Sequence, residues 1–316
     1  MNILVTGASG FVGKVLCDTL CENGHHVVGV YRNANKINPN LQPFIISDFN
    51  ADTDWKEALI GVDVIVHLAA RVHVMIDAAT NPLAEFRKVN VDGTVNLAKQ
   101  AVGLGVKRFV FISSVKVNGE FTESNKPFTE LDIPKPQDDY GISKFEAEQA
   151  LIKISQTTTM EVTIIRPPLV YGKGVRANFA NMIRFIMCGI PLPLGNIHNK
   201  RSLVHVSNLV SMILCCIKHP DAANQTFLVS DGEDVSTTEL LQSCAKAIGV
   251  KARLLPIPQK MLEFGATLLG KKNVAQRLCG NLQVSIDKAR RILGWKPIVS
   301  FSDGIIDTVP TMIKGK

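Results

Sequence analysis

Residues 2–13 read NILVTGASGFVG, and this stretch decides the fold. Residues 2–6 form a short apolar run that is typical of a buried strand, and a helical pattern begins at about residue 11. The turn between them carries Gly7, Gly10 and Gly13. Because glycines lack side chains, such a turn lets the backbone and the helix N-terminus approach a diphosphate. The context favours a dinucleotide-binding turn over glycines that serve packing alone.

The same alternation of strands and helices continues through the first half of the chain. We expect strands near 2–6, 26–31, 44–46, 63–69, 108–113 and 162–166, and helices near 11–23, 54–60, 82–104 and 139–155. Buried strands separated by helices predict an α/β fold with a doubly wound parallel sheet, the Rossmann class. A sheet of this class binds ligands at the carboxyl ends of its strands.

The pattern loosens after about residue 170, where we expect helices near 178–188, 207–218, 236–248, 259–269 and 302–314. We therefore predict a dinucleotide-binding Rossmann domain over 1–170, to which the chain returns near 201–232. A smaller, mostly helical substrate-binding lobe would occupy 171–316. We interpret the apolar stretch MLEFGATLLG (261–270) as a helix buried in this lobe, with contact to a membrane or to another subunit as the alternatives.

The composition of the 316-residue chain is that of a soluble globular protein, with 46% hydrophobic and 20% charged residues. No run approaches the roughly 18 consecutive apolar residues of a membrane span, so we expect no integral membrane segment. The absence of an export signal predicts a cytoplasmic location. Lys and Arg are scattered, so the net charge of +7 does not indicate nucleic acid. It reflects either an ordinary solvated surface or a field that attracts a small anionic substrate such as a nucleotide diphosphate. The seven cysteines show no metal-ligand pattern, and we expect no metal.

A tyrosine and a lysine four residues apart occur in the stretch DDYGISK (138–144). Positions i and i+4 share a face of a helix, so Tyr140 and Lys144 should point into the same space. An unperturbed phenol, with a pKa of about 10, is a poor base at neutral pH, and a nearby cation favours the phenolate. The pair is therefore a candidate proton-transfer device, with an incidental surface pair as the alternative.

The end of the second strand bears on the choice of cofactor. An acidic residue at this place would hydrogen-bond the ribose of NAD, whereas an arginine suits the extra phosphate of NADP. The stretch VGVYRN (28–33) puts Tyr31 where the acid would stand, followed by Arg32. This favours NADP(H) over NAD(H), unless Arg32 is only a solvated loop residue.

Several motifs come in the order and spacing of one known family. They are TGASGFVG (6–13), HLAA (67–70), VNVDGTVN (89–96), ISSVKVNG (112–119), YGISK (140–144), RPPLVYG (166–172), RSLVHV (201–206) and DKARRILGWKP (287–297). In these motifs the chain resembles the extended short-chain dehydrogenase/reductase family, in particular its nucleotide-sugar epimerases, dehydratases and 4-ketoreductases. The resemblance covers nearly the whole chain.

The resemblance implies three catalytic residues. Tyr140 would be the general acid/base, and Lys144 would hold the nicotinamide ribose and lower the pKa of the phenol. Ser114, five residues before Gly119, would hydrogen-bond the sugar oxygen that alternates between alcohol and carbonyl. Strand alternation should point the neighbouring Ser113 to the opposite face.

The resemblance also implies a set of binding residues. Besides Tyr140 and Lys144, the cofactor would contact Gly7, Gly10, Phe11, Val12, Gly13, Arg32, Asp48, Phe49, Leu68, Ala69, Ala70, Asn90 and Pro167. The substrate would contact Lys116, Asn178, Phe179, Arg201 and Arg277. An arginine fork such as that of Arg201 suits phosphate oxygens. His67 is either a further cofactor contact or an ordinary strand-end histidine.

Two departures from the family pattern limit which reaction we expect the protein to catalyse. Dehydratases carry an acidic pair directly after the catalytic serine or threonine, whereas Val115 and Lys116 stand here, so dehydration is not expected. Epimerases commonly show a tyrosine before Gly119, where the chain has an asparagine. Together with the NADP signal, this favours NADPH-dependent 4-ketoreduction of a UDP-4-keto-6-deoxy-N-acetylhexosamine for surface polysaccharide synthesis.

Two other functions stay open. One is a UDP-glucose or UDP-N-acetylglucosamine 4-epimerase that retains NAD. The other is a redox sensor that binds dinucleotide without turnover, against which the complete set of Ser114, Tyr140 and Lys144 argues. Family members form a four-helix dimer interface from the helices that correspond to 82–104 and 139–155, so the resemblance also implies a homodimer.

Overall fold

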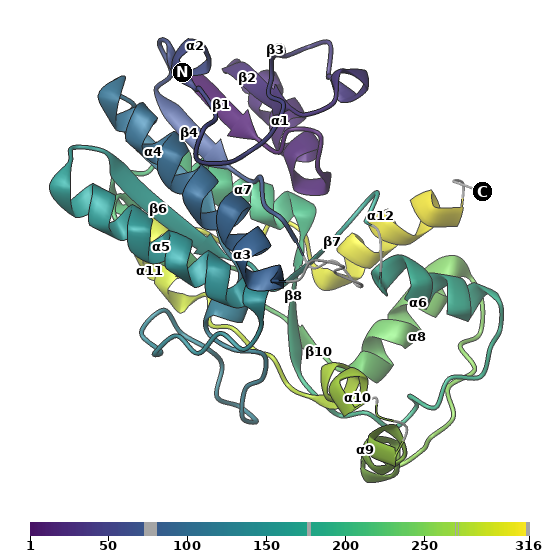
Figure 1. Cartoon of the computed structure of the whole chain (residues 1–316). Coiled ribbons are helices and arrows are strands. Elements are labelled where there is room, and N and C mark those ends of the chain that lie inside the picture. The colour runs from purple at the N-terminus through teal and green to yellow at the C-terminus, as the bar shows by residue number, and fades with distance from the viewer. Residues whose placement is uncertain (73–80, 176–177, 269, 271, 314–316) are drawn as a thin grey trace.

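A seven-stranded parallel sheet forms the centre of the protein. The computed structural model describes residues 1–72, 81–175, 178–268, 270 and 272–313 (Figure 1). The strand order is β3-β2-β1-β4-β5-β6-β9, and all the pairings are parallel. The strands are β1 (Asn2–Thr6), β2 (His26–Tyr31), β3 (Gln42–Ile45), β4 (Val64–His67), β5 (Arg108–Ile112), β6 (Glu161–Arg166) and β9 (Thr226–Leu228).

Helices cover both faces of this sheet. On one face lie α1 (Phe11–Glu22), α7 (Val206–Lys218) and α11 (Asp287–Leu293), and on the other lie α2 (Lys56–Leu59), α4 (Thr94–Gly103) and α5 (Asp139–Thr157). Each set buries its apolar residues against the sheet in a cluster of its own. The doubly wound α/β prediction is therefore confirmed.

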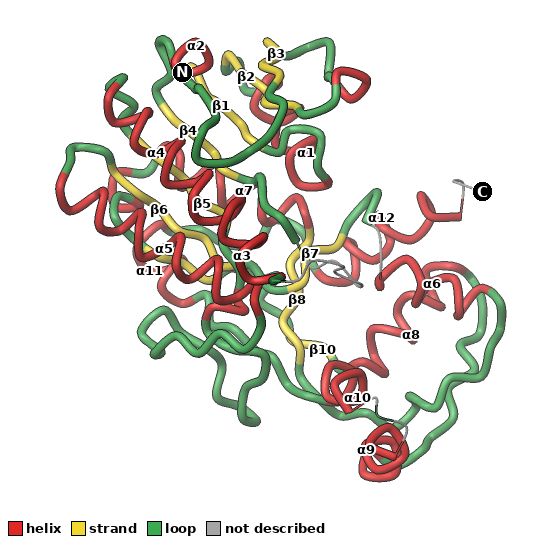
Figure 2. The backbone as a smooth tube through the Cα atoms, in the orientation of Figure 1, coloured by secondary structure: helices red, strands yellow, loops and turns green. Residues whose placement is uncertain are grey.

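A smaller lobe lies to one side of the sheet, as Figure 2 shows. It contains a three-stranded sheet of order β10-β8-β7. Its elements are β7 (Leu169–Tyr171), β8 (Arg201–His205), β10 (Asp234–Val235), α6 (Asn178–Met187), α8 (Thr237–Ile248), α9 (Gln259–Leu268), α10 (Lys272–Cys279) and α12 (Phe301–Ile313). A third apolar cluster joins α6, α8 and α12. The C-terminal region is thus mostly helical, as predicted.

The chain crosses between the two parts more than once. After β8 it returns to the larger part through α7 and β9, and β9 pairs with β6 at the edge of the central sheet. Four short strands, β7 to β10, were not among our predictions. Three of them have only two or three residues, which is too few for a periodicity to be visible in the sequence. The fourth, β8, has five residues, but the stretch RSLVH shows neither an unbroken apolar run nor a strict alternation.

The helix expected over 82–104 is interrupted. It consists of α3 (Pro82–Arg87), a π-helical segment (Lys88–Gly93) and α4. A Cβ atom at Gly93 would lie 2.5 Å from the ring of Phe49, so this glycine lets the π-helical segment approach the loop after β3 closely. Such segments are frequent at functional sites, and this one carries Asn90.

The lobe helix α9 differs from our expectation. We expected the apolar stretch 261–270 to be a buried helix, but α9 has no buried residue. Among the described residues, no helix is both long enough and apolar enough to span a bilayer.

Candidate active site

The glycine turn after β1 brings backbone close to backbone. Gly7 has a φ of +71°, and a Cβ atom there would lie 3.0 Å from the backbone nitrogen of Ala69. A Cβ atom at Gly13 would lie 2.1 Å from the carbonyl oxygen of Gly7, so only glycine lets α1 pack on the turn. Among the described residues, no side-chain hydrogen bond caps α1, which begins after Gly10. The first backbone N–H groups of α1, from Phe11 and Val12 onward, therefore suit a dinucleotide diphosphate.

The end of β4 is tied to the end of β1 beside this turn. The Oγ1 atom of Thr6 accepts the N–H groups of Leu68 (3.2 Å) and Ala69 (3.1 Å) and also contacts Nδ1 of His67 (2.6 Å). Since this oxygen already accepts two hydrogens, its own proton goes to Nδ1. Nε2 of His67 then donates to Thr94 Oγ1 at 2.8 Å. His67 is 1% exposed and serves as a link between β1, β4 and α4.

Asn90 fastens the loop after β4 to α5. Its Oδ1 atom accepts the N–H of Arg71 (2.8 Å), and its Nδ2 donates to the carbonyl of Arg71 (3.0 Å) and to Ser143 Oγ (2.9 Å). Asn90 is 1% exposed. Its side chain therefore positions the strand-end loop and α5 relative to each other.

Ser114 and Tyr140 meet at the carboxyl end of β5. Asp138 caps α5 by accepting the N–H of Gly141 at 2.7 Å, which places Tyr140 in the first turn. Burial and the charge of Asp138 raise the pKa of Tyr140 to about 12, and a hydrogen bond with Ser114 acts in the opposite direction. The resemblance implied a lowered pKa for this phenol, but here burial outweighs the hydrogen bond.

Lys144 is buried on the same face of α5, with 2% exposure. Its Nζ lies 3.9 Å from the ring centroid of Phe111. Burial lowers the pKa of Lys144 to about 7, and the charge of Glu148 counteracts this decrease. Residues 140, 144 and 148 follow at intervals of four, so the phenol, the ammonium and a carboxylate form one row along the helix.

A buried ion pair lies at the end of this row. Arg166, the last residue of β6, donates from Nε (3.0 Å) and Nη2 (2.6 Å) to the two carboxylate oxygens of Glu148. Its Nη1 donates to Asn118 Oδ1 at 3.0 Å. Sequence reasoning missed these three residues, although Glu148 stands one helical turn after Lys144. This spacing was the available signal.

Lys116 lies beside the start of α5. Its ammonium contacts Asp138 and, at 3.3 Å, Glu120. Its backbone N–H donates to Ser114 Oγ at 3.2 Å, and the N–H of Val115 donates to the carbonyl of Pro167 at 3.0 Å. The loop after β5 is thus anchored at the two residues that follow Ser114.

Two arginines come together where the lobe meets β8. Nη1 of Arg201 donates to the carbonyls of Arg277 (2.9 Å) and Gly280 (3.1 Å). Burial, followed by the charge of Arg277, lowers the pKa of Arg201. Neither guanidinium takes part in an ion pair among the described residues. Two close positive charges of this kind suit a diphosphate.

The other predicted contacts are less directly supported. Phe179 is 3% exposed and stacks on Tyr171 inside the lobe, and the side chain of Asn178 lies outside the described part of the chain. Phe49 is buried against His67, with ring centroids 5.2 Å apart. Asp48 is exposed and accepts the N–H of Phe49 at 2.8 Å.

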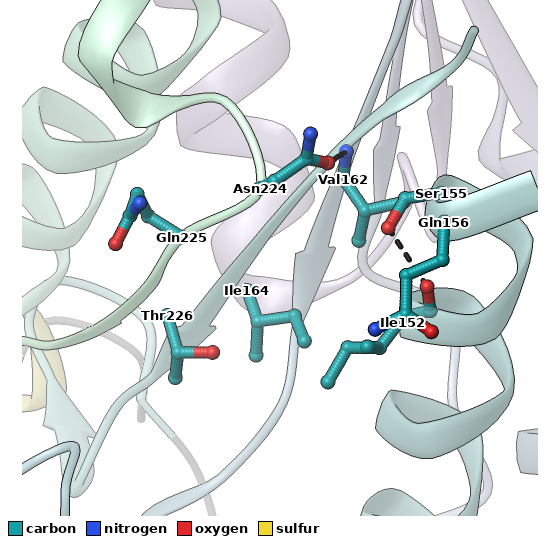
Figure 3. Close-up of a pocket in the computed structure, with 8 residues that line it drawn as sticks. All are labelled: Ile152, Ser155, Gln156, Val162, Ile164, Asn224, Gln225 and Thr226. Atoms are coloured by element: carbon teal, nitrogen blue, oxygen red, sulfur yellow. Dashed lines mark hydrogen bonds between the residues drawn. The ribbon is translucent and has the colours of Figure 1, made fainter. Parts of the chain in front are cut away.

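A pocket of about 250 Å³ lies elsewhere (Figure 3). Its lining is Ile152, Ser155, Gln156, Val162, Ile164, Asn224, Gln225 and Thr226. These residues come from the second half of α5, from β6, and from the start of β9 with the two residues before it, whereas Tyr140 lies at the start of α5. Ligands of such sheets bind at the carboxyl strand ends, so this pocket is not the active site.

Replacing Lys144 by Met should stabilise the protein, because it removes a buried ammonium. The pKa of Lys144 is about 7 when folded, against an ordinary value of 10.5. Between these values the unfolded chain holds a proton that the folded chain lacks, so this lysine destabilises the fold most below pH 7. Lys144→Met should raise the melting temperature by roughly 5 °C at pH 6, and the gain should shrink towards pH 10.

Thermal unfolding followed by circular dichroism at both pH values checks this prediction. The control is Lys153→Met, which changes an exposed lysine of the same helix and should have little effect. A lower melting temperature for Lys144→Met at pH 6 would contradict the prediction.

Replacing Glu148 by Gln should destabilise the fold by about 3 kcal/mol, because Arg166 is left buried without its charge partner. Urea unfolding measures the loss. Glu146→Gln is the matched control, since it removes an ion pair with Arg87 from the exposed side of the same helix and should change stability far less. Equal losses of unfolding free energy in the two variants would contradict a larger contribution of the buried ion pair to stability.

The comparisons with known proteins agree with this geometry. Residues 3–230 match the model of the NAD dependent epimerase/dehydratase family. A UDP-glucose 4-epimerase from Vibrio cholerae is 48% identical, over 99% of this chain and 96% of that protein. An N-acetyl-alpha-D-glucosaminyl-diphospho-ditrans,octacis-undecaprenol 4-epimerase from Escherichia coli O157:H7 is 31% identical, over 83% and 77%. The fold is that of a UDP-glucuronic acid 4-epimerase from Bacillus cereus, solved with NAD, at a TM-score of 0.79, 23% identity and 99% coverage of both chains.

Our expectation of NADP(H) is wrong. The matching family is described as NAD dependent, and the Bacillus cereus protein of the same fold holds NAD. The prediction rested on the identity of two neighbouring residues, which does not decide the cofactor. Tyr31 is 2% exposed and its hydroxyl accepts the N–H of Asn38 at 3.2 Å, so it is a core residue, while Arg32 is an exposed loop residue, which was the alternative to a phosphate contact. Since the family model covers most of the chain and the Vibrio cholerae relative is 48% identical over nearly all of it, the chain belongs to the NAD dependent epimerase/dehydratase family.

Proposed function

We propose that the protein is a UDP-glucose 4-epimerase that retains NAD and interconverts UDP-glucose and its C4 epimer, UDP-galactose. One observation supports the proposal above all. Ser114, Tyr140 and Lys144 lie close together at the strand ends, in a chain that is 48% identical to a UDP-glucose 4-epimerase. The 4-ketoreductase that we first favoured depended on NADPH. The family match removes that support and favours the epimerase alternative.

The two hydroxyl groups would act on the O4 atom of the sugar. Ser114 would orient O4 by a hydrogen bond, while Tyr140 takes its proton and returns it after the sugar has turned over. Bound NAD would supply the acceptor and donor of the C4 hydride. A phenol with a pKa of about 12 is protonated at neutral pH, so Tyr140 needs the charge of a protonated Lys144 on the same face to become a base.

The lobe would hold the nucleotide diphosphate. Arg201 and Arg277 offer two guanidinium groups that repel each other, and a diphosphate between them would relieve this repulsion. Dehydration is not part of the proposal, because Val115 and Lys116 stand where an acidic pair would be needed, and the ammonium of Lys116 already contacts Asp138 and Glu120.

A second candidate differs only in the carrier of the sugar. The Escherichia coli relative acts, by its name, on a sugar linked to undecaprenol through a diphosphate. The large apolar side chains of α9 are exposed, as described below, and could contact the lipid of such a substrate. A lipid-linked sugar diphosphate is therefore the second candidate substrate. The catalytic residues would have the same tasks for either carrier.

We also propose that the protein is cytoplasmic and, on the family resemblance, that it is a homodimer. The interface would be built by residues 82–104, which include α3 and α4, and by α5, which lies side by side with α4 on one face of the sheet (Figure 1).

The function is tested with purified protein and no added cofactor. We expect UDP-galactose to be converted to UDP-glucose, and denaturation of the same protein to release NAD, both followed by chromatography. Conversion of the undecaprenyl diphosphate sugar but not of UDP-galactose would support the second candidate instead. Release of NADP, or net oxidation of added NADPH with a 4-keto sugar, would refute both.

Replacing Tyr140 by Phe should lower the turnover number by about 10²-fold or more, because the proton carrier is lost while the ring and its contact with Phe86 remain. Ser113→Ala is the matched control for Ser114→Ala. Ser113 is buried, and its Oγ has no hydrogen-bond partner among the described residues. Ser114→Ala should lower turnover strongly and Ser113→Ala should not. Near-normal turnover in Tyr140→Phe would refute the assignment.

A further inference from the structure

Helix α9 turns its large apolar side chains outward. Met261, Phe264 and Leu268 are 63%, 67% and 73% exposed, and their spacing places them on one face of the helix. Leu262, Gly265 and Ala266 are only partly exposed, so mostly small residues face the rest of the lobe. A helix whose outer face contacts only water would turn its larger apolar side chains towards the rest of the lobe.

Helix α10 packs against α9 and shows the same inversion. It buries the small Ala275 and Cys279, at 7% and 4% exposure, and presents Val274 and Leu278, at 53% and 37%. The two helices lie together at the end of the lobe farthest from α12 (Figure 1). We call Met261, Phe264, Leu268, Val274 and Leu278 the α9–α10 face. An apolar group of this kind marks a contact surface.

The segment that contains this face is rich in positive charge. Residues 259–280, which include both helices, contain four basic residues and one acidic residue, a net charge of +3. The basic residues are Lys260, Lys271, Lys272 and Arg277, and the acidic one is Glu263. Lys260 and Arg277 are exposed on α9 and α10 themselves.

This charge decides between possible occupants of the face. A second copy of the chain seated on the α9–α10 face would bring two such basic regions together, and like charges across an interface are unfavourable. An anionic bilayer surface attracts the basic residues and accepts the apolar side chains below its headgroups. An apolar face with a basic surround is the composition of helices that lie on membranes.

We infer that the α9–α10 face docks on the surface of an anionic phospholipid bilayer. This property goes beyond the proposed reaction and does not depend on it. Docking would still affect access to the active site, since Arg201 is hydrogen-bonded to the carbonyls of Arg277 and Gly280 at the end of α10. The candidate diphosphate contacts would then lie next to the membrane surface.

The test is co-sedimentation of the full chain with phospholipid vesicles. We expect binding to vesicles of phosphatidylglycerol and phosphatidylcholine, weaker binding at high salt, and little binding to phosphatidylcholine alone. The double variant Phe264→Gln, Leu268→Gln should bind at least tenfold more weakly, because it removes two exposed apolar side chains without touching a buried residue. The control is Ile306→Gln, an equally exposed apolar residue on α12, which should bind like the unchanged protein.

Three results would overturn the inference. They are failure of the unchanged protein to bind anionic vesicles, equal binding by the double variant, and a self-associated protein that the double variant dissociates without any vesicle binding. Turnover of UDP-galactose without vesicles should be the same in the double variant and the unchanged protein. Loss of docking therefore leaves the proposed reaction intact, and absence of epimerase activity leaves the docking result intact.

Discussion

The buried face of α5 is the constraint on which the rest of the active site depends. A lysine ammonium without solvent needs compensation, and Lys144 obtains only part of it from the ring of Phe111. The nearest carboxylate, Glu148, is already committed to Arg166 by two hydrogen bonds. Lys144 therefore has a pKa of about 7. With this pKa, the charge state of Lys144 changes when a ligand binds nearby, and the basicity of Tyr140 changes with it.

The architecture was predictable because it depends on local patterns. The strands of the central sheet before β9, apart from the exposed β3, are largely buried apolar runs. The glycine turn requires small residues at fixed positions, as the 2.1 Å approach at Gly13 shows. The short strands β7 to β10 and the π-helical segment Lys88–Gly93 were not predictable. They follow from tertiary pairing and packing, such as the contact of Gly93 with Phe49, which leave no periodicity in the sequence.

In the candidate site, too, some contacts follow from local sequence spacing and others only from the fold. Tyr140 and Lys144 share one helix, so their spacing alone predicted that they meet. The partners that support them are distant in sequence, as Asn90 is from Ser143 and Arg166 from Glu148, and only the fold brings them together. The cofactor was misjudged for a related reason. Tyr31 and Arg32 were interpreted by their order after a strand, but only the structure shows that one is buried and the other exposed.

The α9–α10 face shows that a hydrophobic pattern predicts an apolar helix face but not what covers that face. The spacing of Met261, Phe264 and Leu268 does indicate an apolar face, but periodicity does not tell which medium covers it. A protein core was the more common explanation, yet here the small residues Ala275 and Cys279 fill the core side. Large apolar side chains left outside, on a segment with four basic residues and one acidic residue, favour a cover that is both apolar and anionic. A phospholipid surface combines these two properties.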